Sequence, residues 1–193
     1  RDDCVEVAGQ LTAVCASLTK IGNDIRLLGS GPRCGLGELQ LPATQPGSSI
    51  MPGKVNPVMS EMLIQVCLYA QGLCQTVAMC GRDGQFQLNV TLPLIAYSLP
   101  ESLGCLANAA DLFAERCVAG LEINADQIDA HLQHSLMLAT ALNPYIGYDK
   151  AAEVAKQAFA QGKTLREVVL EAGLMDAASL DQALDPQKMI RPQ

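Results

Sequence analysis

The stretch VEVAGQLTAVCASLTKIGNDIRLL, residues 5–28, carries the pattern that decides the fold. Its less apolar positions recur at alternating steps of four and three residues, which places them on one narrow stripe of an α-helix. These positions are Glu6, Gln10, Ala13, Ser17, Lys20 and Asp24. Most of the remaining circumference is apolar or small. A helix of this kind is typical of the inside of a helical bundle or of a subunit interface.

Two further long segments repeat the helical pattern. The segment 59–80 again has one stripe that is less apolar than the rest, formed by Glu61, Gln65, Tyr69, Gly72 and Thr76. The segment 85–117 is also apolar, and we expect Pro93 and Pro100 to bend or interrupt it. No strand-type alternation extends beyond a few residues. The sequence therefore predicts an all-α fold, in which a long-helix bundle segment precedes a small C-terminal helical domain.

Glycine and proline mark the divisions of the chain. Residues 29–58 are rich in both, which excludes long regular structure and predicts one extended, flexible loop. Loops of this length in compact domains are usually functional or disordered. After residue 122 the helices become shorter and more conventionally amphipathic, with Asn124 and Thr164 as expected N-caps. We therefore expect two domains, a partial central helix-bundle domain 1–122 that carries the loop, and a small helical domain 123–193.

Composition limits the kinds of partner. The 193 residues are 17% charged with a net charge of −7, so the clustered Lys and Arg that nucleic acid requires are absent. We expect no membrane partner, because no uncharged run approaches the roughly 18 apolar residues of a membrane span. The start of the chain is acidic and therefore unlike a signal peptide. This favours a location in the cytoplasm. Eight dispersed cysteines without a CxxC pair predict small buried hydrophobes rather than a disulfide framework.

The segment GSSIMPGKVNP, residues 47–57, concentrates what an anion site needs. It offers the hydroxyls of Ser48 and Ser49, the cation of Lys54, the amide of Asn56 and glycines that free backbone N–H groups, and it precedes a helix. A nucleotide-binding P-loop is disfavoured, because that motif has four residues between its glycine and Gly-Lys-Ser/Thr. The residues alone leave two interpretations open. One is a small-carboxylate site in which a serine acts as proton acceptor or nucleophile, and the other is a solvated glycine-rich loop.

Two histidines offer a weaker candidate site. His131 and His134 are three positions apart on an expected helix, near Asp126 and Asp129, a pattern that can bind a metal ion. Paired surface histidines on an amphipathic helix are nevertheless ordinary. We expect neither a metal ion nor a cofactor.

Four separated motifs resemble the fumarate lyase superfamily, in particular its aspartase and class II fumarase branch. They are SGPRCGLGE (30–38), GSSIMPGKVNP (47–57), LNV (88–90) and LNPYIGY (142–148), in that order along most of the chain. The resemblance implies that the chain corresponds to the C-terminal part of a longer subunit. It also implies a homotetramer whose central helices form one large bundle, with each active site assembled from three subunits.

The resemblance implies a reaction and a set of residues for it. The family reaction is anti elimination from a C4 dicarboxylate, in which a base removes the C3 proton and ammonia or water leaves from C2 to give fumarate. Ser48 is implied to be the general base, activated by backbone N–H groups when the loop closes. Lys54 and Asn56 are implied to hold a substrate carboxylate, with Ser49 adding hydrogen bonds within the loop. Glu61 is implied to pair with a histidine from another part of the enzyme.

The substrate depends on finer details of the same motifs. Residues 34–39 and 135–138 favour fumarate hydratase, whereas 56–59 followed by Glu61, 84–89, 165–171 and 185–192 look more like aspartases. We therefore expect aspartate ammonia-lyase, with fumarate hydratase as the alternative. A hypothesis from a different class is a non-catalytic helical oligomerisation fragment, which the missing histidine favours.

Overall fold

The computed structural model describes residues 1–44 and 55–190, and the chain divides into two compact units. Unit 1 spans Arg1–Asn124 and unit 2 spans Ala125–Gln193. Almost all regular structure in the described residues is helical, so the expected all-α fold is confirmed. Each unit has a hydrophobic core of its own.

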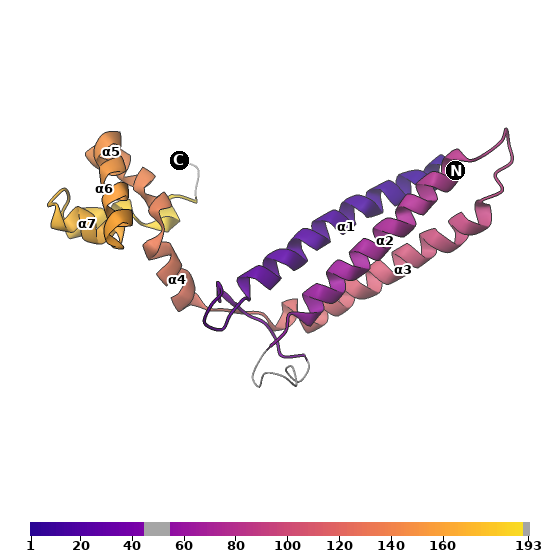
Figure 1. Ribbon diagram of the computed structural model, residues 1–193, viewed down its shortest axis with the longest axis horizontal. Coiled ribbons are helices and arrows are strands. Elements are labelled where there is room, and N and C mark those ends of the chain that lie inside the picture. Colours follow the sequence, from indigo (N-terminus) through magenta and orange to yellow (C-terminus); the bar gives the residue numbers. More distant parts are fainter. Residues whose placement is uncertain (45–54, 191–193) are drawn as a thin grey trace. The chain divides into compact units, whose positions relative to one another are not determined.

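Three long helices build unit 1. They are α1 (Asp2–Leu28), α2 (Val58–Arg82) and α3 (Leu92–Arg116), and they run side by side with alternating direction (Figure 1). The helix α2 lies in the middle, packed against α1 on one side and α3 on the other. The helical patterns in the sequence therefore correspond to three rods of one bundle.

The buried stripe of α2 explains how the rods pack. Its buried residues follow steps of three and four, the spacing of helices that pack nearly parallel to each other. They are Ser60, Leu63, Cys67, Ala70, Cys74, Val77 and Cys80. Alanine and cysteine dominate this stripe, so neighbouring helices can approach closely. Across the whole chain five of the eight cysteines are buried, and burial raises the pKa of Cys15 to about 11.

A short antiparallel ladder joins two distant parts of unit 1. The strand β1 (Leu39–Gln40) pairs with β2 (Glu122–Ile123), with Leu39 opposite Ile123. The expected loop therefore contains a piece of regular structure that its glycines and prolines do not indicate. The pairing ties the chain after α1 to the chain after α3.

The connection from α2 to α3 departs from the expected third helix. This helix begins at Leu92 rather than near residue 85, so Pro93 falls in its first turn, where no helical hydrogen bond is lost. Pro100 lies inside the helix. The residues before α3 form a turn in which Asn89 is 5% exposed and its Nδ2 donates to the Cys80 carbonyl at 2.9 Å. Its Oδ1 accepts from the Thr91 amide at 2.8 Å.

Replacing Asn89 with alanine should lower the free energy of unfolding by about 1–3 kcal/mol, because the Thr91 amide then loses its acceptor and the Cys80 carbonyl loses one of its two side-chain donors. Chemical denaturation of the full-length protein measures this. The matched control is Asn108→Ala, which removes the same group from an exposed position of α3 and should change stability by less than about 0.5 kcal/mol. Equal losses in both variants would contradict the role of Asn89.

Two helices of unit 1 are long and apolar enough to cross a membrane. Eighteen-residue windows of α1 and α2 reach mean hydropathies of 1.2 and 1.4. The expectation that no segment has this character was therefore wrong, since residues 62–81 contain no charged side chain. The core helix of a helical bundle passes the same test, and α2 is buried along its seam. In α1 only 11% of the window is buried, so most of its apolar surface is uncovered in this chain.

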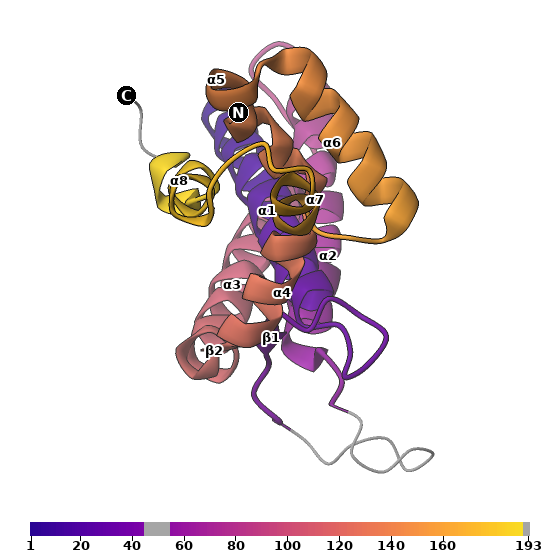
Figure 2. The ribbon, with the colours of Figure 1, turned by 90° about the vertical axis from the view of Figure 1, so that its left-hand side faces the viewer.

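Unit 2 consists of short helices around one core. It contains α4 (Ala125–His134), α5 (Asn143–Ile146), α6 (Tyr148–Gln161), α7 (Leu165–Glu171) and α8 (Ala177–Ala183), of which Figure 2 shows α6, α7 and α8 clearly. Two 3₁₀-helices complete the unit: η2 (Leu136–Leu142) between α4 and α5, and η3 (Pro186–Lys188) after α8. The core is formed by Leu142, Ala151, Val154, Ala158, Leu165, Val168, Val169, Leu180 and Ala183.

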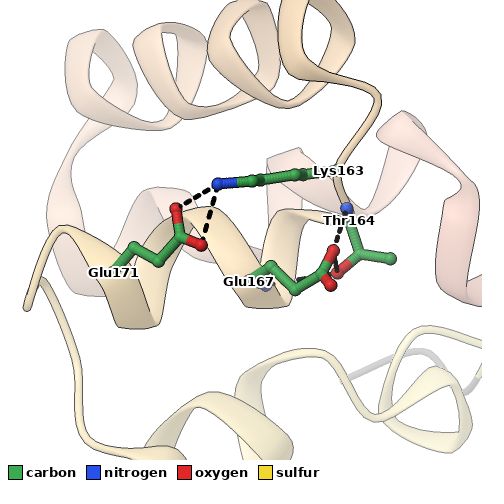
Figure 3. Close-up of polar contacts among 4 residues, drawn as sticks. All are labelled: Lys163, Thr164, Glu167 and Glu171. Carbon is green, nitrogen blue, oxygen red and sulfur yellow. Dashed lines mark hydrogen bonds and ion pairs between the residues drawn. The ribbon is translucent and has the colours of Figure 1, made fainter.

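A reciprocal cap starts α7, as expected from Thr164 (Figure 3). The Thr164 hydroxyl accepts from the Glu167 amide at 3.2 Å, while Glu167 Oε2 accepts from the Thr164 amide at 2.8 Å. These bonds from the backbone and hydroxyl of Thr164 lower the pKa of Glu167. At the C-terminal end of the helix, Glu171 Oε2 lies 2.6 Å from Nζ of Lys163, which precedes the helix. The charged residues of α7 thus serve local folding.

Thr164→Ala should cost about 1 kcal/mol of stability at neutral pH, because the start of α7 loses its cap. The lowered pKa of Glu167 sets the pH dependence. The ionised Glu167 carboxylate stabilises the fold fully above pH 4.5, the ordinary pKa of a glutamate. This stabilisation disappears as the pH falls through the lower pKa that Glu167 has in the folded protein. Denaturation at pH 7 and pH 3 should therefore show a difference between wild type and variant that shrinks in acid. Thr140→Ala, whose hydroxyl donates only to the Met137 carbonyl, is the control.

Candidate active site

The expected site residues fall on and before the start of α2. Ser48, Ser49 and Lys54 lie outside the described residues. Asn56 stands two residues before α2, and Glu61 is in its first turn, where the structure describes both as partly buried. The helix therefore places Asn56 and Glu61 at the same end of the bundle.

The backbone at the start of α2 leaves hydrogen-bond donors free. The N-cap residue is Pro57, which provides no side-chain cap. The Val58 amide donates to the Asn56 carbonyl at 2.8 Å, and the Glu61 amide donates to the Pro57 carbonyl at 3.0 Å. Among the described residues no acceptor faces the amides of Met59 and Ser60. The end of a 25-residue helix with free amides attracts negative charge.

A small hollow opens beside this helix start, with room for about one water molecule. Three segments of unit 1 line it: Pro42 and Thr44 after β1, residues 56–60 at the start of α2, and Arg116 with Cys117 after α3. Asn56 is the one expected site residue of the described part that lines it. The end of α3 therefore lies beside the candidate site. The sequence does not indicate that these two segments are neighbours.

Ser60 and Cys117 lie close together in the wall of this hollow. The Ser60 hydroxyl is fully buried and has no hydrogen-bond partner among the described residues. Burial raises the pKa of the Cys117 thiol, and the nearby Ser60 hydroxyl opposes part of this rise, although the two groups do not reach hydrogen-bond geometry. Sequence reasoning missed both residues, because Ser60 falls among the buried positions of α2 and the sequence predicts Cys117 to be a small buried hydrophobe.

The motif SGPRCGLGE (30–38) forms a tight turn rather than an extended loop. The Ser30 hydroxyl donates to the Leu27 carbonyl at 2.6 Å and accepts from the Leu36 amide at 3.0 Å. A Cβ atom on Gly35 would lie 2.3 Å from the Ser30 carbonyl, so this position requires glycine. Asn124, the last residue of unit 1 in the sequence, stabilises the turn, because its Nδ2 donates to the Gly37 carbonyl at 3.0 Å. The motif therefore shapes the chain that leads to the site.

The two histidines of α4 make local contacts. Nε2 of His131 lies 2.8 Å from Nε2 of Gln127, and Nδ1 of His134 lies 2.8 Å from the Ala130 carbonyl oxygen. Within residues 1–44 and 55–190, no three His, Cys, Asp or Glu side chains are grouped so that they could hold a metal ion.

Two family models match the chain. The model described as "Lyase" matches residues 1–72, and "Fumarase C C-terminus" matches residues 138–191. Among curated relatives, "Fumarate hydratase class II" of Thermosynechococcus vestitus is 53% identical over 94% of this chain and 39% of its own length. "Fumarate hydratase 1, mitochondrial" of Arabidopsis thaliana is 51% identical over 99% of this chain and 39% of its own length.

Solved structures agree with these matches. The fumarate lyase:delta crystallin of Brucella melitensis, bound to cobalt, aligns with a TM-score of 0.93 at 50% identity, covering 98% of this chain and 41% of that one. The class II fumarase of Schistosoma mansoni aligns with a TM-score of 0.92 at 40% identity, covering 100% of this chain and 40% of that one. The chain belongs to the fumarate lyase superfamily, in the branch of aspartases and class II fumarases. It spans about two fifths of the length of the relatives it matches.

The expectation of aspartate ammonia-lyase was wrong. Relatives that are 49–53% identical over 94–100% of this chain are named fumarate hydratases. The aspartase-like stretches are short, and one of them, 165–171, forms α7. There Glu167 caps the helix, and Arg166 Nε lies 2.9 Å from Asp181 Oδ1. Residues that are constrained by helix capping and ion pairing carry little information about the leaving group of the reaction.

Proposed function

We propose that this chain is part of a class II fumarate hydratase, which interconverts malate and fumarate. The observation that carries the proposal is 49–53% identity to proteins named fumarate hydratase over 94–100% of the chain. The signature 47–57 and the free amides at the start of α2 agree with a dicarboxylate substrate, because both favour bound anions.

The proposed mechanism assigns a role to each signature residue. Ser48 removes the C3 proton of malate, and the electron pair moves into the adjacent carboxylate to give a doubly charged intermediate. Lys54 and Asn56 stabilise that charge, since a cation and an amide donor act most strongly where charge develops. The C2 hydroxyl then takes up a proton from a general acid outside this chain and leaves as water, while the electron pair returns from the carboxylate to form the C2–C3 double bond of fumarate. Ser49 holds the loop, and no metal or cofactor is required in this scheme.

The remaining parts of the proposed site come from elsewhere in the full-length protein. We propose that Glu61 pairs with a histidine outside this chain and orients it. We also propose a homotetramer, supported by Val7, Val14 and Ile21, which are 42–45% exposed at seven-residue spacing on α1. Such a seam requires a second helix. The 193-residue chain alone should therefore be inactive, and sedimentation of the full-length protein as a monomer would contradict the assembly.

The substrate is tested by following the ultraviolet absorbance of fumarate with the full-length protein. We expect fumarate to form from malate and not from aspartate. Glu61→Gln serves as a second variant, since it keeps the size of the side chain and removes its charge. Absence of turnover with malate would overturn the proposed function. The cytoplasm stays a prediction, since the relatives include both a bacterial and a mitochondrial fumarate hydratase.

A further inference from the structure

Two glycines of unit 1 lie against the segment that leads to the signature 47–57. A Cβ atom added to Gly29 would lie 2.7 Å from Leu41 Cγ, and one added to Gly120 would lie 2.9 Å from Pro42 Cγ. Carbon atoms pack at about 3.5–4.0 Å, so neither position has room for a methyl group. Gly29 has a φ of −82° and Gly120 has no positive φ, so the backbone itself does not require glycine at either position. The requirement for glycine comes from the neighbouring side chain.

The two contacts fix one segment to two different elements. Gly29 is the C-cap of α1, and Gly120 ends the 3₁₀-helix η1 (Val118–Gly120) that follows α3. Leu41 and Pro42 are consecutive and directly follow β1, which is paired with β2. This segment is therefore anchored by close packing against the end of α1 and against η1, and by strand pairing just before it.

The same segment borders the candidate active site. Pro42 and Thr44 line the small hollow that residues 56–60 also line, so the chain before the signature and the start of α2 lie side by side. Ser48 follows Pro42 by six positions, 48 − 42, and a chain of six residues spans at most about 20 Å. The place of Pro42 therefore limits where the proposed base lies relative to α2.

We propose that Gly29 and Gly120 are positioning residues for fumarate hydration. Neither has a side chain that takes part in the reaction. They leave room for Leu41 and Pro42, and so hold in place the chain that leads to Ser48. The inference rests on the proposed function and extends it to two residues outside the signature 47–57.

The first test compares rates of fumarate formation in the full-length protein. Gly120→Ala should lower kcat for malate about 10–100-fold, because a displacement of about 1 Å at a catalytic group can cost a factor of about 10². Gly29→Ala should give a loss of the same order through Leu41, which is a separate contact. The matched control is Gly84→Ala in the turn before α3, where an added Cβ would lie no closer than 3.5 Å to any atom beyond its chain neighbours. This control should keep the wild-type kcat.

A second substitution separates positioning from a general loss of stability. Pro42→Ala removes the Cγ atom that the new Cβ of Gly120→Ala would approach, and the next nearest atom, Pro42 Cβ, would lie at 3.4 Å, an ordinary contact. The double variant Gly120→Ala/Pro42→Ala should therefore recover the kcat of Pro42→Ala alone. A double variant that stays as slow as Gly120→Ala, while Pro42→Ala alone is fast, would contradict the proposal. So would a Gly120→Ala enzyme that unfolds at a lower temperature but keeps the wild-type kcat, because its glycine would then have a structural role only.

Hydrogen exchange measures the packing without substrate. Followed by mass spectrometry, the amides of residues 36–44 should exchange faster in Gly120→Ala than in the wild type, while those of 63–80 in α2 keep their rate. Wild-type exchange at 36–44 in both glycine variants would overturn the inference, whether or not the enzyme turns over malate. An inactive wild type would overturn the proposed function and with it this role of the glycines. An active wild type with full turnover in both variants would overturn the inference alone.

Discussion

Ser48→Ala in the full-length enzyme should lower kcat for malate by about 10²–10⁴-fold, the usual contribution of a general base. An alanine has no group that can accept the C3 proton, and the rest of the proposed site would still bind substrate. KM should therefore change much less than kcat. The expected result is read from initial rates of fumarate formation with purified enzyme.

Two controls define what this result means. Ser49→Ala removes the neighbouring hydroxyl, and we expect a smaller fall in kcat because that residue is proposed to hold the loop. Ser17→Ala removes an exposed hydroxyl of α1 that donates to the Ala13 carbonyl, and it should leave the rate unchanged. A Ser48→Ala enzyme with near wild-type kcat would eliminate Ser48 as the base.

Phe113→Ala should lower the free energy of unfolding by about 3–5 kcal/mol, the range for removing a buried aromatic side chain. Phe113 is 4% exposed and packs on α3 with Cys15 of α1 and Leu63 of α2. It therefore connects all three helices of unit 1, and its loss leaves a cavity where they meet. Chemical denaturation of the full-length protein gives the measurement.

Phe86→Ala provides the comparison within the same unit. Phe86 is fully exposed in the turn before α3, so its removal should change stability by less than about 0.5 kcal/mol. The Phe86 backbone has a φ of +49°, and alanine also carries a Cβ atom, so the substitution leaves the steric constraint at this position unchanged. If Phe113→Ala were as stable as Phe86→Ala, the contact between the three helices would not hold unit 1 together.

Periodicity identified the helices of unit 1 because burial in a helix repeats every three to four residues. The stripe of Glu61, Gln65 and Thr76 predicted the less buried side of α2, and its buried seam lies elsewhere on the circumference. The start of α3 was misplaced. The apolar texture of 85–91 resembles a helix, and only the bonds of Asn89 to Cys80 and Thr91 reveal a turn.

The spacing of residues within the motifs identified the candidate site more specifically than the composition of the chain did. The segment 47–57 identified the superfamily, which the comparisons confirm, because eleven consecutive positions must match at once. The choice between aspartase and fumarase failed on short stretches such as 165–171. Those residues are constrained by the cap and ion pairs of α7, so their identity reflects local folding more than chemistry.

The sequence by itself determined the helical class, the positions of the long helices and the family, since each depends on patterns within one segment. Only the tertiary structure decided which segments meet. It pairs Leu39 with Ile123, brings Arg116 and Cys117 to the start of α2, and buries the Ser60 hydroxyl there. The physical reason is that a helix pattern records which residues avoid water, whereas the partners that cover them come from distant parts of the chain.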